Sequence, residues 1–221
     1  PPLARFSELF ACDDQLFLSF AELDHYPARS GGDFLGPVFA LGQGVEPNWP
    51  PGPGPRIFAY LKPGYGALDK VLSALAGLPA SVLVHLPGAA RKTVATYSTG
   101  TMTVAVEPLA MEALRRSCDL CLCHGGAGTT AAMLLAGKPL VLLPMHMEQT
   151  MTARRLSDLG VAVTVVPEAC GQLPRLLKKV LATPELAAAA GRFAARHGDY
   201  DQQATIRQAA DRGEALLGAA R

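Results

Sequence analysis

The chain has 221 residues, of which 49% are hydrophobic and 18% are charged, and its formal net charge is +1. This composition excludes an intrinsically disordered chain, because disorder requires low hydrophobicity together with high net charge. The net charge is −2 up to residue 110 and +3 beyond it, so neither half attracts nucleic acid or an anionic membrane surface in bulk. The longest apolar runs fall well short of the roughly 20 residues of a transmembrane segment.

The cysteines and the first residues of the chain indicate in which cellular compartment the protein is located. The number of cysteines, five, is odd, and a chain of this size does not need disulfide bonds for its stability, which argues against a disulfide framework. Residues 1–8 lack the pattern of a signal peptide. These features predict a soluble, cytoplasmic protein. Because the chain begins with Pro1 and not with methionine, we expect a piece of a longer protein.

Residues 1–55 do not have the pattern of a self-sufficient domain. One short apolar run at residues 15–20 is typical of a buried strand. Residues 27–55 are rich in glycine and proline around an apolar patch at residues 34–41, and the stacked prolines of residues 47–55 hold the chain extended. This region is predicted to be a linker that follows a strand.

From residue 56 onward, short apolar runs alternate with segments of helical period. We expect strands at residues 57–61, 81–86, 102–106, 120–123, 140–143 and 161–165, and helices at residues 66–76, 109–116, 126–136, 148–159, 173–181, 184–197 and 202–217. Apolar strands that alternate with helices predict an α/β fold, a doubly wound, Rossmann-like parallel sheet. Ligands of such sheets bind at the carboxyl ends of the strands.

One glycine-rich loop lies where a predicted strand ends and a helix begins. The loop consists of His124, Gly125, Gly126, Ala127, Gly128, Thr129 and Thr130. Its glycines allow a tight turn, and the first N–H groups of the helix present the positive end of the helix dipole. A diphosphate suits this loop, with the threonine hydroxyls as further donors and His124 as a hydrogen-bonding group or, when protonated, a countercharge. A purely structural turn is the alternative interpretation.

The loop after the next strand carries a carboxylate and an amide, Glu148 and Gln149. In a parallel sheet this loop lies beside the glycine loop. A carboxylate and an amide near a phosphate site suit the recognition of vicinal hydroxyls, as on a sugar. Taken without the glycine loop, Glu148 is typical of a first-turn acid that favours the helix dipole, and Gln149 of a solvated surface residue.

These residues together resemble a known signature. The glycine loop, residues 136–139 (Ala-Gly-Lys-Pro), Pro144, the Glu148–Gln149 pair and Ala153 resemble the nucleotide-sugar signature of the UDP-glycosyltransferase superfamily, inverting enzymes of the two-domain GT-B architecture. The resemblance implies the donor-binding half of a GT-B glycosyltransferase. It implies three segments: the end of the amino-terminal domain and interdomain linker at residues 1–55, the nucleotide-sugar donor-binding domain at 56–183, and carboxy-terminal helices at 184–221.

The resemblance further implies a function: inverting transfer of a sugar from a UDP- or dTDP-type donor to an acceptor, without metal or other cofactor. The donor-binding residues predicted on this basis are His124, Gly125, Gly126, Ala127, Gly128, Thr129, Thr130, Glu148, Gln149, His146, Pro108 and Lys62. In the family the general base and the acceptor site belong to the amino-terminal domain. We therefore assign no catalytic residue, and we expect that this chain alone does not turn over.

Three departures from the family pattern leave the nucleoside open. Ala132 stands where the family usually has a glutamate for the ribose hydroxyls, and Pro108 is the main match in the segment near the base. Lys62 begins a Lys-Pro-Gly-Tyr turn in place of a glycine-serine turn, and it could supply a charge to phosphate. Two alternatives remain: an epimerase-like nucleotide-sugar enzyme, and a non-catalytic module that binds a nucleotide sugar or a protein.

Two further sequence features have more than one interpretation. Cys118, Cys121, Cys123 and His124 place four soft ligands within seven residues, but in a strand His124 would face away from Cys121 and Cys123. Buried cysteines that act as small apolar side chains are the favoured interpretation. His85 ends a predicted strand in the ligand-facing row, where both a ligand contact and a structural role fit.

Overall fold

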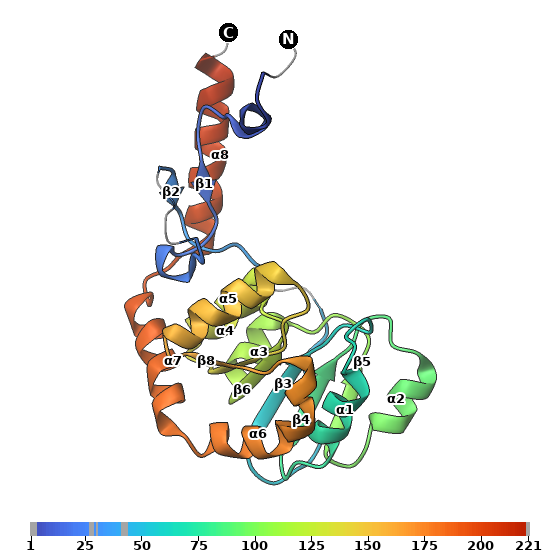
Figure 1. Ribbon diagram of the computed structural model, residues 1–221. Coiled ribbons are helices and arrows are strands. Elements are labelled where there is room, and N and C mark those ends of the chain that lie inside the picture. The colour runs from blue at the N-terminus through green and yellow to red at the C-terminus, as the bar shows by residue number, and fades with distance from the viewer. Residues whose placement is uncertain (1–3, 27–28, 30, 41–43, 220–221) are drawn as a thin grey trace. The chain divides into compact units, whose positions relative to one another are not determined.

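Alternating strands and helices occupy residues 56–199 of the structure, a computed structural model that describes residues 4–26, 29, 31–40 and 44–219 (Figure 1). Residues 39–199 form one unit, and the segments up to residue 38 and from residue 200 form a second. The domain bounds expected from the sequence, at residues 55 and 183, stay predictions. Residues 27, 28, 30 and 41–43 of the expected linker lie outside the described residues.

The larger unit contains a six-stranded parallel sheet. Its strands are β3 (Arg56–Tyr60), β4 (Ser81–His85), β5 (Met102–Ala105), β6 (Leu120–Cys123), β7 (Leu140–Leu142) and β8 (Ala162–Thr164). The order is β5-β4-β3-β6-β7-β8, and every neighbouring pair is parallel. The predicted α/β fold is confirmed. The order changes direction between β3 and β6, which makes their carboxyl ends a topological switch point, the place where such sheets bind ligands.

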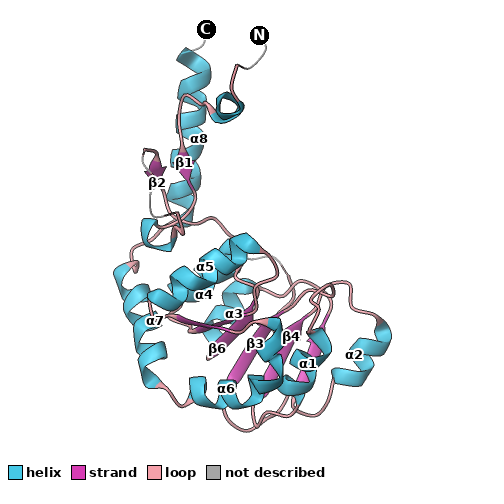
Figure 2. Cartoon of the chain, in the orientation of Figure 1, coloured by secondary structure: helices cyan, strands magenta, loops and turns pink. Residues whose placement is uncertain are grey.

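Helices pack against this sheet (Figure 2). They are α1 (Leu68–Ala76), α2 (Arg91–Tyr97), α3 (Met111–Ser117), α4 (Ala127–Leu135), α5 (Met147–Asp158), α6 (Leu173–Leu181) and α7 (Pro184–Arg196), with a 3-10 turn η3 (Pro167–Gln172) before α6. Apolar side chains of α1 and α6 join alternate residues of β3 and β4 in one buried cluster. Contacts of α4 with β6, α3 and α7 cover residues of the other sheet face. The central strands β3, β4, β6 and β7 are buried along most of their length, as their continuous apolar runs predict, whereas the edge strands β5 and β8 are only partly buried.

The sequence pattern does not predict helix α2. The physical reason for this miss is that the helix is weakly buried. No residue of α2 is buried, and its first residues, Arg91 and Lys92, are exposed. Only partly buried side chains, Val94 and Tyr97, pack on the core cluster. A helix with so narrow an apolar stripe has little hydrophobic periodicity to detect.

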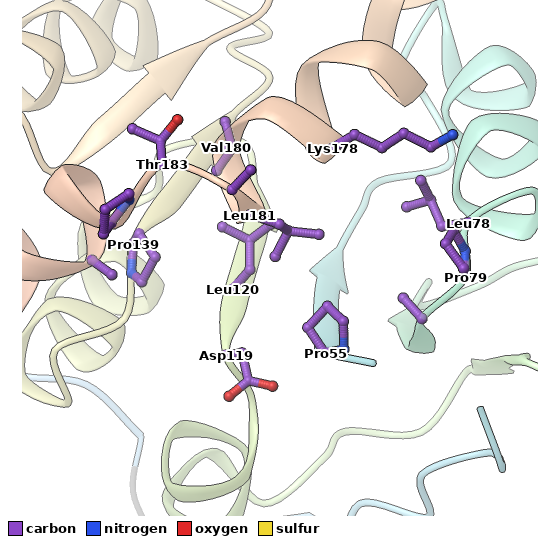
Figure 3. A pocket seen from close by; sticks show the side chains of 14 residues that line it. Pro55, Leu78, Pro79, Asp119, Leu120, Pro139, Lys178, Val180, Leu181 and Thr183 are labelled. Atoms are coloured by element: carbon purple, nitrogen blue, oxygen red, sulfur yellow. The ribbon is translucent and has the colours of Figure 1, made fainter. Parts of the chain in front are cut away.

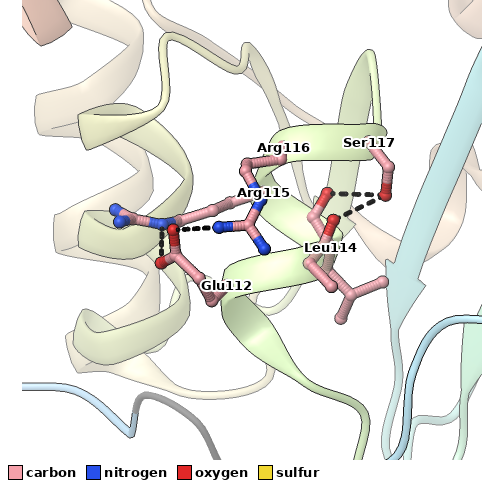
Figure 4. A network of polar contacts seen from close by, with 6 residues as sticks. Glu112, Leu114, Arg115, Arg116 and Ser117 are labelled. Carbon is pink, nitrogen blue, oxygen red and sulfur yellow. Dashed lines mark hydrogen bonds and ion pairs between the residues drawn. The ribbon is translucent and has the colours of Figure 1, made fainter.

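Helix α3 is stabilised by short-range ion pairs (Figure 4). Glu112 pairs with Arg115 at 2.6 Å and with Arg116 at 2.9 Å, and the Arg115 guanidinium lowers the pKa of this carboxyl. At the end of the helix, the Ser117 hydroxyl donates to the Leu114 carbonyl at 3.4 Å and to that of Ala113 at 2.6 Å. The helix bears two side chains of the cavity described below.

The smaller unit joins the first segment to the last helix. It contains β1 (Leu16–Phe17), β2 (Asp33–Phe34), the 3-10 turns η1 (Phe6–Phe10) and η2 (Ala21–Leu23), and α8 (Gln202–Ala219). The two strands are parallel. The strand expected at residues 15–20 is present but shorter than predicted, and β2 falls inside the expected linker. Arg212 of α8 forms ion pairs with Asp14 and Asp33. Among the described residues, no helix has both the length and the apolar character needed to span a membrane.

Candidate functional site

A histidine links the ends of three strands at the switch point. His124 follows β6, and its Nε2 accepts a hydrogen bond from the backbone N–H of Lys62, just beyond β3, at 3.0 Å. Its Nδ1 lies 2.7 Å from the backbone carbonyl of Leu143, just beyond β7. We call these two hydrogen bonds the His124 bridge. Because Nε2 accepts, the proton of the neutral ring is on Nδ1, which donates to Leu143.

The surroundings of His124 favour a neutral ring. The residue is only 5% exposed, and this burial lowers the pKa of the imidazole; the nearby Lys62 ammonium lowers it further, against the opposing effect of the Leu143 carbonyl. Both ring nitrogens are paired with backbone groups in the structure, and the role of His124 toward a diphosphate stays a prediction.

The glycine loop turns from β6 into α4 with its backbone open to solvent. Gly125 has a φ of +85°, a conformation that a side chain disfavours. Gly126 is extended and serves as the N-cap of α4, no side chain caps that helix, and Gly126 and Ala127 are exposed. The first-turn N–H groups of a helix lack intrahelical partners. This arrangement is suited to an anion.

The two threonines of the loop have different roles. The Thr130 hydroxyl donates to the Gly126 carbonyl at 2.8 Å, and the residue is only 2% exposed. This hydroxyl stabilises the turn by a hydrogen bond within the loop, whereas the sequence predicts it as a donor to a ligand. Thr129 is half-buried and lines a cavity together with Gly128. Of the two threonines, Thr129 is thus the one that lines the cavity.

The second predicted loop lies beside the first. A Cβ added to Gly125 would lie 3.5 Å from the backbone oxygen of Gln149, so the two loops are in contact. The Gln149 Oε1 accepts a hydrogen bond from the Met145 N–H at 2.8 Å. Glu148, in the first turn of α5, and His146, its N-cap, are exposed. The Gln149 amide oxygen is therefore used within its own loop, and the Glu148 carboxylate is open to solvent.

Lys62 brings a positive charge to the same place. Its side chain is exposed, and its Nζ donates to the Tyr60 hydroxyl at 2.7 Å. The Tyr60 ring stacks on His85, with 5.0 Å between centroids and 14° between planes. Burial, and secondarily the Lys62 charge, lower the pKa of His85. Burial and, to a lesser degree, the Lys62 charge thus lower the pKa of both His85 and His124.

A cavity of about 270 Å³ opens at the carboxyl ends of β3 and β4. Its polar or loop residues are Tyr60, His85, Pro108, Gly128 and Thr129, and its apolar wall is made by Phe39, Ala40, Phe58, Leu109, Met111 and Leu114. The cavity therefore brings together Pro108 and part of the glycine loop, two of the segments predicted to bind the donor. The sequence offers a signal for His85, its place at a strand end; Phe39 lies in the apolar patch of residues 34–41, which does not indicate a place in this cavity.

A larger cavity, of about 570 Å³, lies at the opposite edge of the sheet (Figure 3). Prolines and aliphatic side chains line most of it, and its charged side chains are Asp119 and Lys178. The Asp119 carboxylate already accepts a hydrogen bond from the Arg56 N–H at 2.8 Å. This cavity adjoins the amino ends of β3 and β6, away from the strand ends where ligands of such sheets bind. The smaller cavity is the better candidate site.

The cysteines of β6 and Cys118, the residue that follows α3, belong to the core. Cys118, Cys121 and Cys123 are all buried. The Cys118 thiol lies 3.8 Å from the Met133 sulfur, and burial raises the pKa of this thiol to about 12.

Ala132 is 0% exposed. Because an alanine side chain carries no polar group, this position offers no hydrogen-bond partner to a ribose.

The family of the chain follows from a match over most of this unit. Residues 69–202 match the family model described as "Erythromycin biosynthesis protein CIII-like, C-terminal domain", which is more than half of the chain. The chain belongs to this family. The chain corresponds to the C-terminal domain of this family, as its resemblance to the C-terminal half of a GT-B glycosyltransferase predicts.

Individual proteins similar to this chain are glycosyltransferases, in agreement with the family match. A PGL/p-HBAD biosynthesis glycosyltransferase of Mycobacterium tuberculosis (strain H37Ra) is 31% identical over 179 residues, 75% of this chain and 39% of the relative. The structure of the spinosyn rhamnosyltransferase SpnG has a TM-score of 0.72 at 22% identity, covering 90% of this chain and 56% of SpnG. The glycosyltransferase VinC in complex with dTDP has a TM-score of 0.59 at 20% identity, over 70% of this chain and 40% of VinC. The chain thus spans about two fifths of the curated relative, and the solved structures share its fold.

Proposed function

We propose that this chain is the donor-binding part of a metal-independent, inverting glycosyltransferase that uses a UDP- or dTDP-type sugar donor. The observation that carries the proposal is the start of α4, which no side chain caps. It lies at the switch point near Lys62 and next to the cavity of about 270 Å³. Both the anion-binding helix end and the position in the sheet are those expected for a nucleoside diphosphate. Related structures include SpnG complexed with thymidine diphosphate and VinC with dTDP.

Each part of the donor has matching groups in the site. The N–H groups of residues 125–129 and the Lys62 ammonium suit the diphosphate. The exposed Glu148 carboxylate and the Gln149 NH₂ group suit sugar hydroxyls, with His146 at the same loop. The cavity beside Pro108 suits the nucleoside, because about 270 Å³ is just below the usual range for ligand pockets and fits a ring better than a whole nucleotide sugar.

The chemistry assigned to this chain is stabilisation of the leaving group. The acceptor oxygen attacks the anomeric carbon, the bond from that carbon to the diphosphate oxygen breaks, and negative charge develops on the diphosphate. Fixed N–H donors and Lys62 stabilise that charge without reorganising. The acceptor proton passes to a base that we place in the amino-terminal domain, together with the acceptor site. We therefore expect this chain alone to bind the donor but not to transfer sugar.

Calorimetric titration with UDP, dTDP and GDP, and with the corresponding nucleosides, tests the proposal. We expect binding that requires the diphosphate. In the Ala127→Glu variant a carboxylate occupies the start of α4, so affinity should fall at least about tenfold, although the helix itself gains from an acid in its first turn.

The matched control is Ala188→Glu, which makes the same change at an exposed position of α7. This control should bind as the unaltered chain does. If the folded chain binds none of these nucleotides, the proposal fails and a non-catalytic module becomes the better explanation. Equal affinity for nucleosides and their diphosphates would also contradict it.

A further inference from the structure

We propose that the open edge of β8, together with α6, is a docking groove for an extended, acidic peptide segment of a partner protein. β8 is the last strand in the order of the sheet, and within the part of the chain that the structure describes it pairs only with β7. The inference is independent of the donor site, because none of the residues predicted to bind the donor lines this groove.

The outward backbone groups of β8 are placed to pair with a further strand. On the side of β7, the Val161 carbonyl accepts a hydrogen bond from the Leu140 N–H at 3.1 Å. The Val165 N–H donates to the Leu142 carbonyl at 2.8 Å. Because successive residues of a strand direct their N–H and C=O groups to opposite sides, those of Thr164 point away from β7. Edge groups of this kind form hydrogen bonds with an added strand.

A groove of about 300 Å³ lies against this edge. It is lined by the end of β8, by the turn η3 and by α6, which contribute Thr164, Val165, Ala169, Gln172, Arg175, Leu176 and Lys179. Its volume is at the lower end of the usual range for binding pockets. An exposed sheet edge beside such a groove is the arrangement in which a peptide adds as a strand and places alternate side chains in the groove.

Arg175 and Lys179 give the groove a positive charge that no acidic side chain balances. Both are exposed, no acidic residue lines the groove, and neither forms an ion pair within the described residues. Arg175 stands in the first turn of α6, where the positive end of the helix dipole disfavours a cation. It also lies four residues before Lys179, a spacing at which like charges repel. The helix itself gains nothing from this arginine, whereas the carboxylates of a bound partner relieve both effects.

The spacing of these two cations fits an extended chain. Residues four apart in a helix are separated by about 6 Å along its axis, and alternate residues of a strand by about 6.6 Å. Two acidic side chains that are two positions apart in a strand therefore match Arg175 and Lys179. An inorganic anion uses these charges but not the edge groups of β8, so the combination favours a peptide.

Selection of random eight-residue peptides, displayed on phage, against the folded full chain tests the proposal. We expect the enriched peptides to carry aspartate or glutamate at alternate positions. Their affinity should fall at least about tenfold in the double variant Arg175→Glu, Lys179→Glu, whereas its affinity for UDP should stay within about threefold of that of the unaltered chain. No enrichment, or enriched peptides without alternating acids, would overturn the proposal.

The matched control for these charges is Lys178→Glu. It reverses the neighbouring exposed charge on the same helix, at a residue that lines the larger cavity and not this groove. Affinity for the enriched peptide should stay within about threefold, because the control leaves both groove cations in place. A loss as large as that of the double variant would mean that the peptide responds only to the overall charge of α6, which contradicts a specific groove.

Two substitutions at Thr164 test the pairing of strands. Thr164→Pro removes the outward N–H, a change that an edge strand tolerates. Thr164→Val keeps this N–H and, like the proline variant, removes the hydroxyl, whose Oγ1 lies 3.1 Å from the Ser157 Oγ. We expect peptide affinity to fall about tenfold or more in the proline variant and to stay within about threefold in the valine variant, after circular dichroism shows that both fold.

Hydrogen exchange of the unaltered chain decides the same point without a substitution. The Thr164 amide should exchange at least about tenfold more slowly in the peptide complex than in the free chain, because its N–H gains a partner. Equal peptide affinity of the two Thr164 variants, or unchanged exchange of this amide, would overturn the docking of a strand at β8.

Discussion

Gly125 holds the one backbone conformation in the glycine loop that a side chain resists. Its φ is +85°, and a Cβ there would make only ordinary contact with Gln149, so the cost of a side chain is backbone strain and not a clash. Gly125→Ala should therefore lower the free energy of unfolding by about 1–2 kcal/mol, measured by urea unfolding. Gly191→Ala, in the interior of α7 with free space around it, should raise it by up to about 1 kcal/mol. Equal effects of the two changes would contradict this account.

At the scale of elements, α8 is held to the first segment by a buried hydroxyl. Thr205 is buried, and its Oγ1 donates to the Leu35 carbonyl at 2.7 Å. Thr205→Val keeps the shape but leaves that carbonyl unpaired, so amides of α8 should open more easily by about 1–3 kcal/mol in hydrogen exchange. Thr99→Val makes the same change at an exposed turn and should leave α8 unaffected. Unchanged exchange in the Thr205 variant would show that the helix docks by other contacts.

For the whole molecule, two partly enclosed histidines predict an acid-sensitive fold. Burial lowers the pKa of both His85 and His124 below the ordinary value of 6.5. Below about pH 6.5 the unfolded chain therefore binds more protons than the folded one, so stability is fully present above that pH and falls as the pH drops toward the lowered values. Urea midpoints should decrease between about pH 7.5 and 5. His85→Phe removes one of the two groups and should make the decrease shallower; a flat profile in the unaltered chain would contradict the prediction.

Much of the fold was predictable because its signals are local. Apolar runs such as residues 120–123 and 140–143 are continuous, which is typical of strands covered on both faces, and they match β6 and β7 closely. The weakly buried α2 and the two-residue β2 carry no such signal. Their presence depends on partners elsewhere in the chain, which a local pattern does not contain.

The sequence by itself determined the α/β class, the glycine loop at a strand-to-helix turn and the family, because periodicity, glycine spacing and a motif are properties of short segments. Tertiary structure alone decided which polar atoms remain free in the site. The two rings that favour the neutral state, the Gln149 oxygen turned back to Met145 and the cavity wall at Phe39 are examples. His124 shows the reason: its partners lie 62 and 19 residues away, so its charge and hydrogen bonds follow from which strand ends the sheet brings together.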